Sequence, residues 1–405
     1  MKAHATASAG PVAPKKPSRW IPPRIEKLLW ARAAGRCQCA GCNAPLWKSE
    51  LNQESVAVGQ NAHIWAFSED GPRSNDGIRA DEIHHPSNLI LVCYPCHRLI
   101  DADKRGEEFS VDILRLWKLE HEARVERVTG IASALKSHVL FYGANTGAHS
   151  VRWSFREVAN ALFPDRYPAE DRAIELGLDN SATRDDGPRF WELELTNLRS
   201  HFDHQVRARA GRRGPEGIQH VSVFALAPQP LLVALGGLLG DIGPGDVYQL
   251  RREPPGWDFA TDDDSGWPEL AFEETSDPEG TPALVVGLSA SVTRDRIDSV
   301  LGSDCAVWRL TVPHPHNDVV VRRSQLRAFR QTVRRALDRV KEVHGQKTQL
   351  HIFPAMPVSA AVELGRVRMP KAEMPWRIYD QLPKHGFVPV IDMLGDETVA
   401  VRGES

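Results

Sequence analysis

The spacing of apolar residues predicts two helices near the amino-terminal end of the chain. In the stretch 23–35, apolar side chains recur at helical spacing between Pro23 and Gly35. Proline favours the first position of a helix and glycine the position after its end, so these two residues mark the expected ends. In the stretch 110–128 a second helix is expected, because four side chains share one helical face. They are Leu114, Trp117, His121 and Val125.

One apolar pattern occurs twice in the remainder of the chain. The segments 219–236 and 350–365 each hold an apolar run, a proline-containing loop and a second apolar run that ends in glycine. Their register is constant without gaps, and this predicts a duplicated strand–loop–helix unit from two fused Rossmann-like halves. The matched pairs are Phe224 and Phe353, Pro228 and Pro357, Val233 and Val362, Leu235 and Leu364, and Gly236 and Gly365.

Such a unit directs its loop and the start of its helix to one spot above the carboxyl end of the strand. Free backbone N–H groups and the helix dipole make that spot suited to an anion. Two copies related by a pseudo-dyad would face one pocket, which predicts a ligand with two or more phosphates. The alternative is an ordinary α/β domain whose duplicated loop binds nothing.

Composition limits the partners without naming one. The chain has 405 residues, 41% of them hydrophobic, so two or more domains with real cores are expected. The net charge of −3 excludes a basic nucleic-acid coat. Residues 1–19 are rich in Ala, Pro, Lys and Ser and should be a disordered arm. Basic residues are in excess as far as Arg36, which suits either a DNA backbone or a solubilising tail.

Five of the six cysteines form two clusters about fifty residues apart, which can share one tetrahedral zinc ion. Cys93 and Cys96 supply two ligands, and two of the three cysteines 37, 39 and 42 supply the others. Clustering of this type favours a reducing cytosol, here that of a bacterium, over secretion. No signal peptide and no long uncharged apolar run is evident, so no membrane partner is expected.

Between the cysteine clusters lie His63, Asn88 and His97. Phosphodiester cleavage needs an activated water, a cation on the developing charge and a stabilised leaving oxygen, and a neutral histidine is a suitable base. The segment resembles the HNH nucleases, a ββα-metal fold in which these three residue types build a one-metal site. The resemblance implies that His63 is the general base, that Asn88 orients its ring through a side-chain carbonyl, and that His97 binds Mg²⁺ or another divalent cation.

The chain departs from the commonest HNH pattern at Ala62, where many members carry a metal ligand. Asp101 lies four residues after His97 and is the expected replacement, because both would share one helical face. The resemblance also favours Cys37 with Cys42 as zinc ligands over the usual knuckle of Cys39 with Cys42. Two alternatives remain: a zinc knuckle that only binds DNA, and a metal role for the His pair at 84 and 85, which otherwise reads as a solvated loop.

Three segments of the remainder resemble SAVED domains, which are fused pairs of CARF-like halves that sense cyclic oligonucleotides. These are 350–366 followed by Tyr379-Asp380, 283–291 followed by 305–311, and 221–232 continuing to 240–242. The resemblance implies an α/β protein with a disordered basic arm at 1–19, an HNH endonuclease domain at 20–135, a linker at 136–155 and a SAVED sensor at 156–405.

Candidate ligand contacts come from both halves of this sensor. Two lie near the helix starts, three could offset phosphate charge, and two tyrosines could stack on bases or belong to the core. They are Gln229 and Ser359, then His316, Arg366 and Lys371, then Tyr248 and Tyr379.

Together the resemblances imply an HNH–SAVED effector of the cyclic-oligonucleotide anti-phage (CBASS) systems. Such an effector is a metal-dependent nuclease of double-stranded DNA, silent until a cyclic di- or trinucleotide drives its homo-oligomers to assemble. One rival is a restriction-type HNH nuclease whose C-terminal half reads modified DNA, although the acidic stretches 262–264 and 269–279 do not suit DNA contact. Another is an inactive sensor or zinc-stabilised scaffold.

Overall fold

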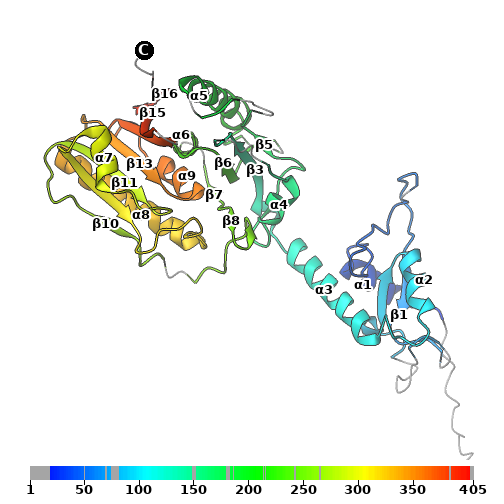
Figure 1. Ribbon diagram of the computed structural model, residues 1–405. Helices are drawn as coiled ribbons and strands as arrows, with labels where there is room; N and C mark the ends of the chain where they lie inside the picture. Colours follow the sequence, from blue (N-terminus) through cyan, green and yellow to red (C-terminus); the bar gives the residue numbers. More distant parts are fainter. Residues whose placement is uncertain are drawn as a thin grey trace, which may run out of the picture. The chain divides into compact units, whose positions relative to one another are not determined.

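The computed structural model forms two compact units, Met1–Ala132 and Ser133–Ser405 (Figure 1). Nearly all of the expected basic arm lies outside the described residues. No helix in the described part of the chain is long and apolar enough to cross a bilayer. The structure describes residues 19–49, 51–68, 71–73, 82–147, 152–178, 183–185, 187–212, 214, 216–240, 243–263, 266–382 and 385–401.

The first unit is a two-stranded sheet with helices around it. The strands β1 and β2 pair antiparallel, with His63 opposite Leu89, and every residue of β2 is buried. Both expected helices are present: α1 begins at Pro23, and Ser110 caps α3 by accepting a hydrogen bond from the backbone N–H of Ile113. The elements are α1 (Pro23–Arg32), β1 (Gln60–His63), the 3-10 turn η1 (Pro86–Asn88), β2 (Leu89–Val92), α2 (Tyr94–Ala102) and α3 (Val111–Thr129).

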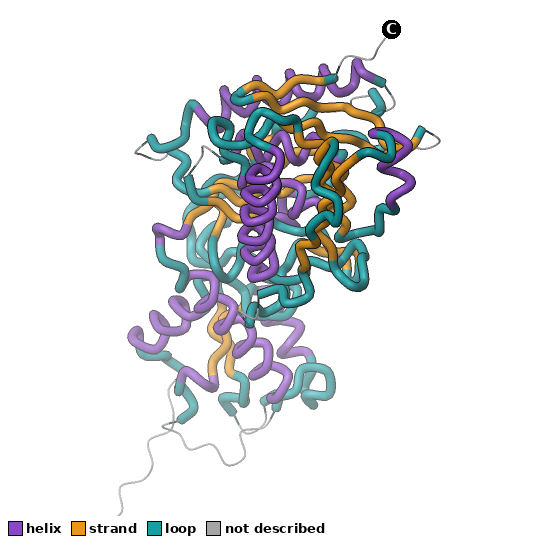
Figure 2. Tube along the Cα trace, turned by 90° about the vertical axis from the view of Figure 1, so that its left-hand side faces the viewer, coloured by secondary structure: helices purple, strands orange, loops and turns teal. Residues whose placement is uncertain are grey.

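The second unit contains two main sheets flanked by helices (Figure 2). One sheet has the order β4-β3-β6-β7, with β5 beside β3, and its strands are parallel. Its strands are β3 (Lys136–Gly143), β4 (Tyr167–Pro168), β5 (Ile174–Glu175), β6 (Val221–Leu226) and β7 (Gly245–Val247).

The other sheet has the order β10-β12-β11-β13-β14-β15-β16, parallel from β12 to β14 and antiparallel at both edges. Its strands are β10 (Ala271–Glu273), β11 (Thr281–Gly287), β12 (Cys305–Thr311), β13 (Leu350–Ala355), β14 (Trp376–Leu382), β15 (Gly386–Leu394) and β16 (Glu397–Ala400), and a separate pair is formed by β8 (Arg251–Arg252) and β9 (Pro255–Gly256). The helices are η2 (Ser133–Leu135), α4 (Phe155–Asn160), α5 (Pro188–Phe202), the π-helical turn η3 (Asp203–Arg207), α6 (Gln229–Leu239), α7 (Arg294–Leu301), α8 (Arg323–His344) and α9 (Val358–Val367).

Part of the expected linker 136–155 is a core strand. Residues 136–143 form β3, which pairs with β4, β5 and β6, and six of its eight positions are buried. A linker has no sheet partners, so the second unit begins before β3.

The duplicated pattern folds as expected, into β6 with α6 and β13 with α9. The helices α6 and α9 pack on each other through their matched glycines, and the main core continues across them from one sheet to the other. A Cβ atom on Gly236 would lie 2.0 Å from the carbonyl oxygen of Val362, and one on Gly365 would lie 2.0 Å from that of Val233. Only glycine allows this approach, so the matched residues of the repeat meet at the crossing point.

Candidate functional site

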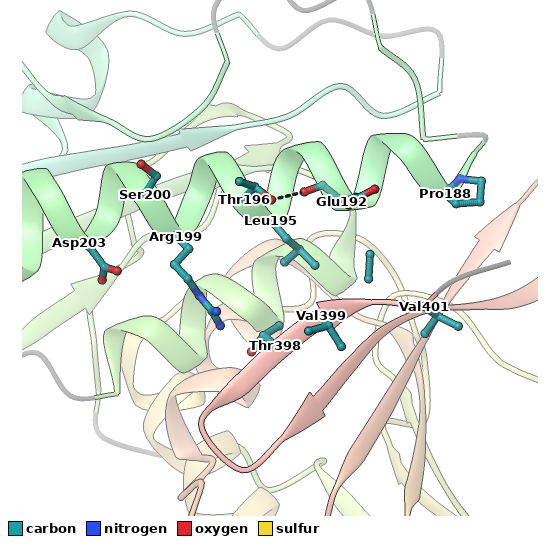
Figure 3. A pocket seen from close by; sticks show the side chains of 11 residues that line it. Pro188, Glu192, Leu195, Thr196, Arg199, Ser200, Asp203, Thr398, Val399 and Val401 are labelled. Atoms are coloured by element: carbon teal, nitrogen blue, oxygen red, sulfur yellow. Dashed lines mark hydrogen bonds between the residues drawn. The ribbon is translucent and has the colours of Figure 1, made fainter.

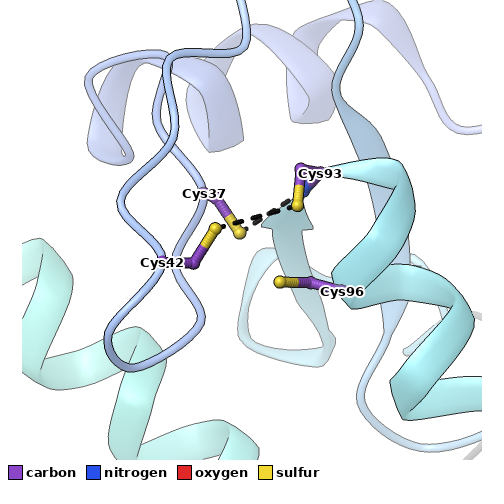
Figure 4. Close-up of side chains that lie close together, drawn as sticks. All are labelled: Cys37, Cys42, Cys93 and Cys96. Carbon is purple, nitrogen blue, oxygen red and sulfur yellow. Dashed lines mark hydrogen bonds between the residues drawn. The ribbon is translucent and has the colours of Figure 1, made fainter.

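Four cysteines of the first unit converge on one point (Figure 4). Cys37 and Cys42 lie in the loop after α1, Cys93 directly precedes α2, and Cys96 lies in its first turn. Their sulfur atoms are all within 4.8 Å of one another, and those of Cys42 and Cys93 are 3.8 Å apart. A tetrahedral zinc with bonds of about 2.3 Å places sulfurs about 3.8 Å apart, so the cluster fits structural zinc.

Cys39 is not one of the four, although it is buried beside them. A hydrogen bond with the Cys39 side chain, opposed by burial and aided by the backbone N–H of Cys93, lowers the pKa of Cys37 to about 5. The four sulfur atoms that converge are those of Cys37, Cys42, Cys93 and Cys96. The set is the one that the HNH resemblance favours.

His63 ends β1 and lines a pocket of about 370 Å³. Burial, followed by the nearby His84 and Arg19, lowers the pKa of His63 to about 4. The ring is therefore neutral near pH 7 and can accept a proton, as a general base must.

Asn88 fixes the backbone around this histidine. Its side-chain oxygen accepts a hydrogen bond from the backbone N–H of Trp65 (2.8 Å), and its side-chain nitrogen donates to the carbonyl of Ile83 (3.0 Å). The Asn88 side-chain carbonyl was expected to accept a hydrogen bond from the ring of His63, but the side chain instead bonds to the backbone of Trp65 and Ile83.

His97 and Asp101 lie on α2 and line the same pocket as His63. Nδ1 of His97 is 3.6 Å from Oδ2 of Asp101, as the four-residue spacing predicts. Ala62 is buried, on the opposite side of β1 from the pocket-lining His63, so a longer side chain there would enter the core. The residues facing the pocket can therefore offer a cation the imidazole and carboxylate that were expected.

His84 lies beside His63, whereas the sequence offered it only as half of a possible metal-binding His pair or as part of a solvated loop. Its Nδ1 lies 3.3 Å from Nε2 of His63, and the ring is half-buried rather than solvated. His85 is exposed and contacts Ser87 instead. No spacing rule relates residues 63 and 84, because their proximity depends on a loop that returns to the end of β1.

A pocket of about 540 Å³ in the second unit is lined from both copies of the repeat. Pro228 and Gln229 contribute from the start of α6, and Pro357 and Val358 from the start of α9. Both helix starts open on one pocket, as the pseudo-dyad predicted. The remaining lining includes charges of both signs, from Arg152 and Arg252 and from Asp185, Asp318 and Asp380.

Two of the expected ligand contacts lie at this pocket. Gln229 lines it, and its side-chain oxygen accepts a hydrogen bond from the backbone N–H of Met356 (3.0 Å). Ser359 lies beneath it, fully buried, and donates to the side-chain oxygen of Gln249 through both its hydroxyl (2.7 Å) and its backbone N–H (3.1 Å). Gln249 lines the pocket and was not expected.

The two tyrosines belong to the core. Tyr248 stacks on Phe224 and Tyr379 on Phe353, and the ring centroids are 4.4 Å apart in both pairs. Each tyrosine is almost completely buried, and neither lines the pocket. Their matched positions reflect the repeat, because each tyrosine fills the same place in the core of its own half.

The three expected cations lie elsewhere. Arg366, in the last turn of α9, donates to the carbonyl of Gly245 (3.1 Å) and to the buried carboxylate of Glu363 (3.0 Å), away from the helix start. Lys371 is exposed on the turn after α9. His316 is exposed too, although it adjoins the pocket-lining residues 317 and 318. The cations that do line the pocket are Arg152 and Arg252.

A separate hollow of about 590 Å³ lies between α5 and β16 (Figure 3). Its lining mixes apolar side chains with Glu192, Arg199 and Asp203. None of the expected site residues lines it.

Comparison with known families divides the chain in the same way. The HNH endonuclease family matches residues 37–104, and the SAVED family, described as the SMODS-associated and fused to various effectors sensor domain, matches residues 198–393. No curated protein matches the chain.

Solved structures that match part of the chain include Cap4 SAVED/CARF-domain containing receptors. That of Acinetobacter baumannii, with the cyclic trinucleotide 2'3'3'-cAAA, is 13% identical with a TM-score of 0.41, covering 69% of this chain and 56% of the receptor. The same figures hold for its complex with 3'3'3'-cAAA. The Moraxella osloensis receptor is 11% identical with a TM-score of 0.37, covering 79% and 61%. The chain thus spans less than two thirds of these receptors.

Proposed function

Because the chain joins an HNH endonuclease domain to a SAVED sensor domain, as HNH–SAVED effectors do, we propose that it is a DNA endonuclease of CBASS anti-phage defence. A cyclic di- or trinucleotide switches it on. The observation that carries this proposal is the pocket where α6 and α9 both begin, in a chain that also holds a histidine-lined pocket of nuclease type.

The substrate is double-stranded DNA, cut by hydrolysis of a phosphodiester. His63 accepts the proton of the attacking water, since its low pKa keeps the ring neutral and unprotonated. His97 and Asp101 would hold a divalent cation such as Mg²⁺, which would supply a Lewis acid for the negative charge on the phosphate oxygens. A zinc ion held by the four cysteines would keep α2, and with it this ligand pair, against the sheet.

The ligand is recognised by its phosphates and its bases at different places in the pocket. The starts of α6 and α9 present backbone N–H groups and the positive ends of two helix dipoles, and Arg152 and Arg252 add charge. Asp185, Asp318 and Asp380 would repel phosphates and suit hydrogen-bond donors on the base edges instead. A modified DNA duplex would bring a continuous phosphate backbone to these acids, which disfavours the restriction-type alternative.

Ligand binding activates the nuclease by assembling protomers. A ligand stabilises whichever state of the protein binds it better. The pocket is built from two halves, and a bound ligand fixes the distance between them. Fixing that spacing favours the homo-oligomer in which nuclease units act together on DNA.

The test is cleavage of linear double-stranded DNA by the full chain with Mg²⁺ and a panel of cyclic di- and trinucleotides. We expect cleavage only with a subset of the panel, with assembly seen by light scattering at the same concentrations. His63→Ala should lower the rate by about 10²- to 10⁴-fold, the usual contribution of a general base. His85→Ala is the matched control, because His85 is exposed and contacts Ser87, and it should cut as wild type does.

Two results would contradict the proposal. Cleavage independent of every nucleotide, together with preferential cutting of modified DNA, would favour the restriction-type reading. Cleavage by His63→Ala at the wild-type rate would remove His63 as the base.

A further inference from the structure

Arg73, in the turn Gly71-Pro72-Arg73, has no role in the reaction proposed above, yet it lines the same pocket as His63. The residue is only 7% exposed and has a φ of 57°, a conformation that costs free energy for any residue except glycine. A buried charge in a strained backbone persists only where other contacts fix it.

The guanidinium group contacts two separate elements. Its Nε donates to the carbonyl of Ile64 (2.8 Å), just beyond β1, and its Nη1 donates to the carbonyl of Ile100 (2.9 Å), in the last turn of α2. Its Nη2 lies 3.5 Å from the carbonyl oxygen of His63 and 3.9 Å from Oδ1 of Asp101. One side chain therefore joins the backbone of the base to the helix that carries the metal-ligand pair.

The shape and charge of arginine suit this position. Its planar fork presents several N–H donors in fixed directions, whereas a lysine ammonium is a single point that cannot reach the same oxygens together. The last carbonyls of a helix lack partners and carry partial negative charge, so a cation beside Ile100 is favourable.

The arginine itself is held at both ends. Its carbonyl accepts a hydrogen bond from the backbone N–H of Ala66 (3.1 Å), and a Cβ atom on Gly106 would lie 2.9 Å from its Cγ. The backbone and the aliphatic part of Arg73 are thus held by contacts of their own, in addition to those of the guanidinium group.

We propose that Arg73 is a positioning residue that sets the distance between His63 and the pair His97 and Asp101. It acts through the backbone carbonyls of β1 and α2 and does not touch the reacting atoms. This inference rests on the proposed nuclease function, since it concerns the geometry of that site.

The test is Arg73→Lys in the full chain, which keeps the charge and the aliphatic stem but removes the fork. We expect kcat for DNA cleavage to fall about 10- to 100-fold with KM within about twofold, because positioning acts on the reaction more than on DNA binding. Affinity for Mn²⁺, measured without DNA by electron paramagnetic resonance, should fall about tenfold. Zinc content and melting temperature should stay close to those of wild type.

The matched control is Arg105→Lys. Arg105 pairs with Glu107 (3.6 Å), and both side chains are largely exposed, so this exchange should leave cleavage and Mn²⁺ affinity unchanged. A wild-type kcat and Mn²⁺ affinity in Arg73→Lys would overturn the inference. So would a loss of activity that only follows a loss of zinc and of folded protein. If wild-type protein cuts no DNA with any nucleotide, the proposed function fails, while the Mn²⁺ measurement still tests Arg73.

Discussion

Replacing Gly236 by alanine should push apart the two helices that build the ligand pocket. The added Cβ would lie 2.0 Å from the carbonyl oxygen of Val362 and 2.8 Å from the Cα of Gly365, both backbone atoms of α9. A backbone atom cannot rotate away as a side chain can, so the clash is relieved only by moving one helix.

The size of the effect follows from three terms. An ordinary carbon–oxygen contact is roughly 3.2 Å, so the helices must separate by about 1 Å, and overpacking of this kind costs about 1–3 kcal/mol. Alanine regains up to about 1 kcal/mol through its better helix propensity. We therefore expect Gly236→Ala to lower the free energy of unfolding by about 2 kcal/mol, which corresponds to about 4–8 °C in melting temperature for a unit of this size.

Gly237→Ala is the control at the adjacent position. Its Cβ would meet only the terminal methyl of Met393, at 2.9 Å, which can swing aside. This variant should be as stable as wild type or slightly more stable. Gly365→Ala should match Gly236→Ala, because its Cβ would lie 2.0 Å from the carbonyl oxygen of Val233. The double variant should lose less than the sum, since one separation of the helices relieves both clashes.

Thermal and urea unfolding of the full chain measure these differences in stability. Calorimetry with the activating nucleotide measures the affinity of the pocket for its ligand. Because α6 and α9 begin at the pocket, a shifted crossing should also weaken ligand binding. Equal stability of Gly236→Ala and Gly237→Ala would refute the close crossing. Strictly additive losses in the double variant would show that the two glycines act at separate places.

Other predictions concern the zinc cluster and one buried acid. Cys96→Ser should lose zinc and destabilise the first unit, whereas Cys39→Ser should keep its zinc. Full zinc occupancy of Cys96→Ser, measured by mass spectrometry, would contradict the four-cysteine site. Burial, opposed by a hydrogen bond from Tyr142, raises the pKa of Glu194 from 4.5 to about 7. The folded state holds this proton more tightly than the unfolded state does. The contribution of Glu194 to the free energy of unfolding is therefore full below pH 4.5 and is lost as the pH rises through 7. Unfolding should cost about 3 kcal/mol less at pH 8 than at pH 4.5 from this group alone, and Glu194→Gln should lack that dependence in urea titrations.

Sequence reasoning succeeded where residues that lie close together in space are related by a regular spacing or by a repeat in the sequence. The repeat matched Gly236 with Gly365 in sequence, and the structure brings these two residues together where α6 crosses α9. The pair His97 and Asp101 followed from helical spacing alone, because residues four apart share one face of a helix.

It failed where separate loops meet. Arg73 contacts the backbone of His63 from a turn that no periodicity relates to β1. His84 was considered as a metal ligand but not as a neighbour of His63, and its Nδ1 lies 3.3 Å from Nε2 of that ring. The pocket-lining Arg152 lies in an irregular segment and Arg252 in the two-residue strand β8, and neither has a sequence pattern, so the sequence offered Arg366 and Lys371 in their place. The strand β3 was missed for another reason, because its short apolar run leads directly into a glycine-containing loop that resembled a boundary.

The two halves of the sensor are alike in their cores but unlike in the pocket. Gln249 and Asp380 each follow the stacked tyrosine of their half, and both line the pocket. Gln249 is neutral and is committed to Ser359 on the other half. Burial, together with the nearby Asp185, raises the pKa of Asp380 to about 6. The duplication therefore supplies a symmetric frame, and substitution at one matched position makes the two sides of the pocket chemically different. A ligand bound there would meet the amide of Gln249 from one half of the repeat and the carboxyl group of Asp380 from the other.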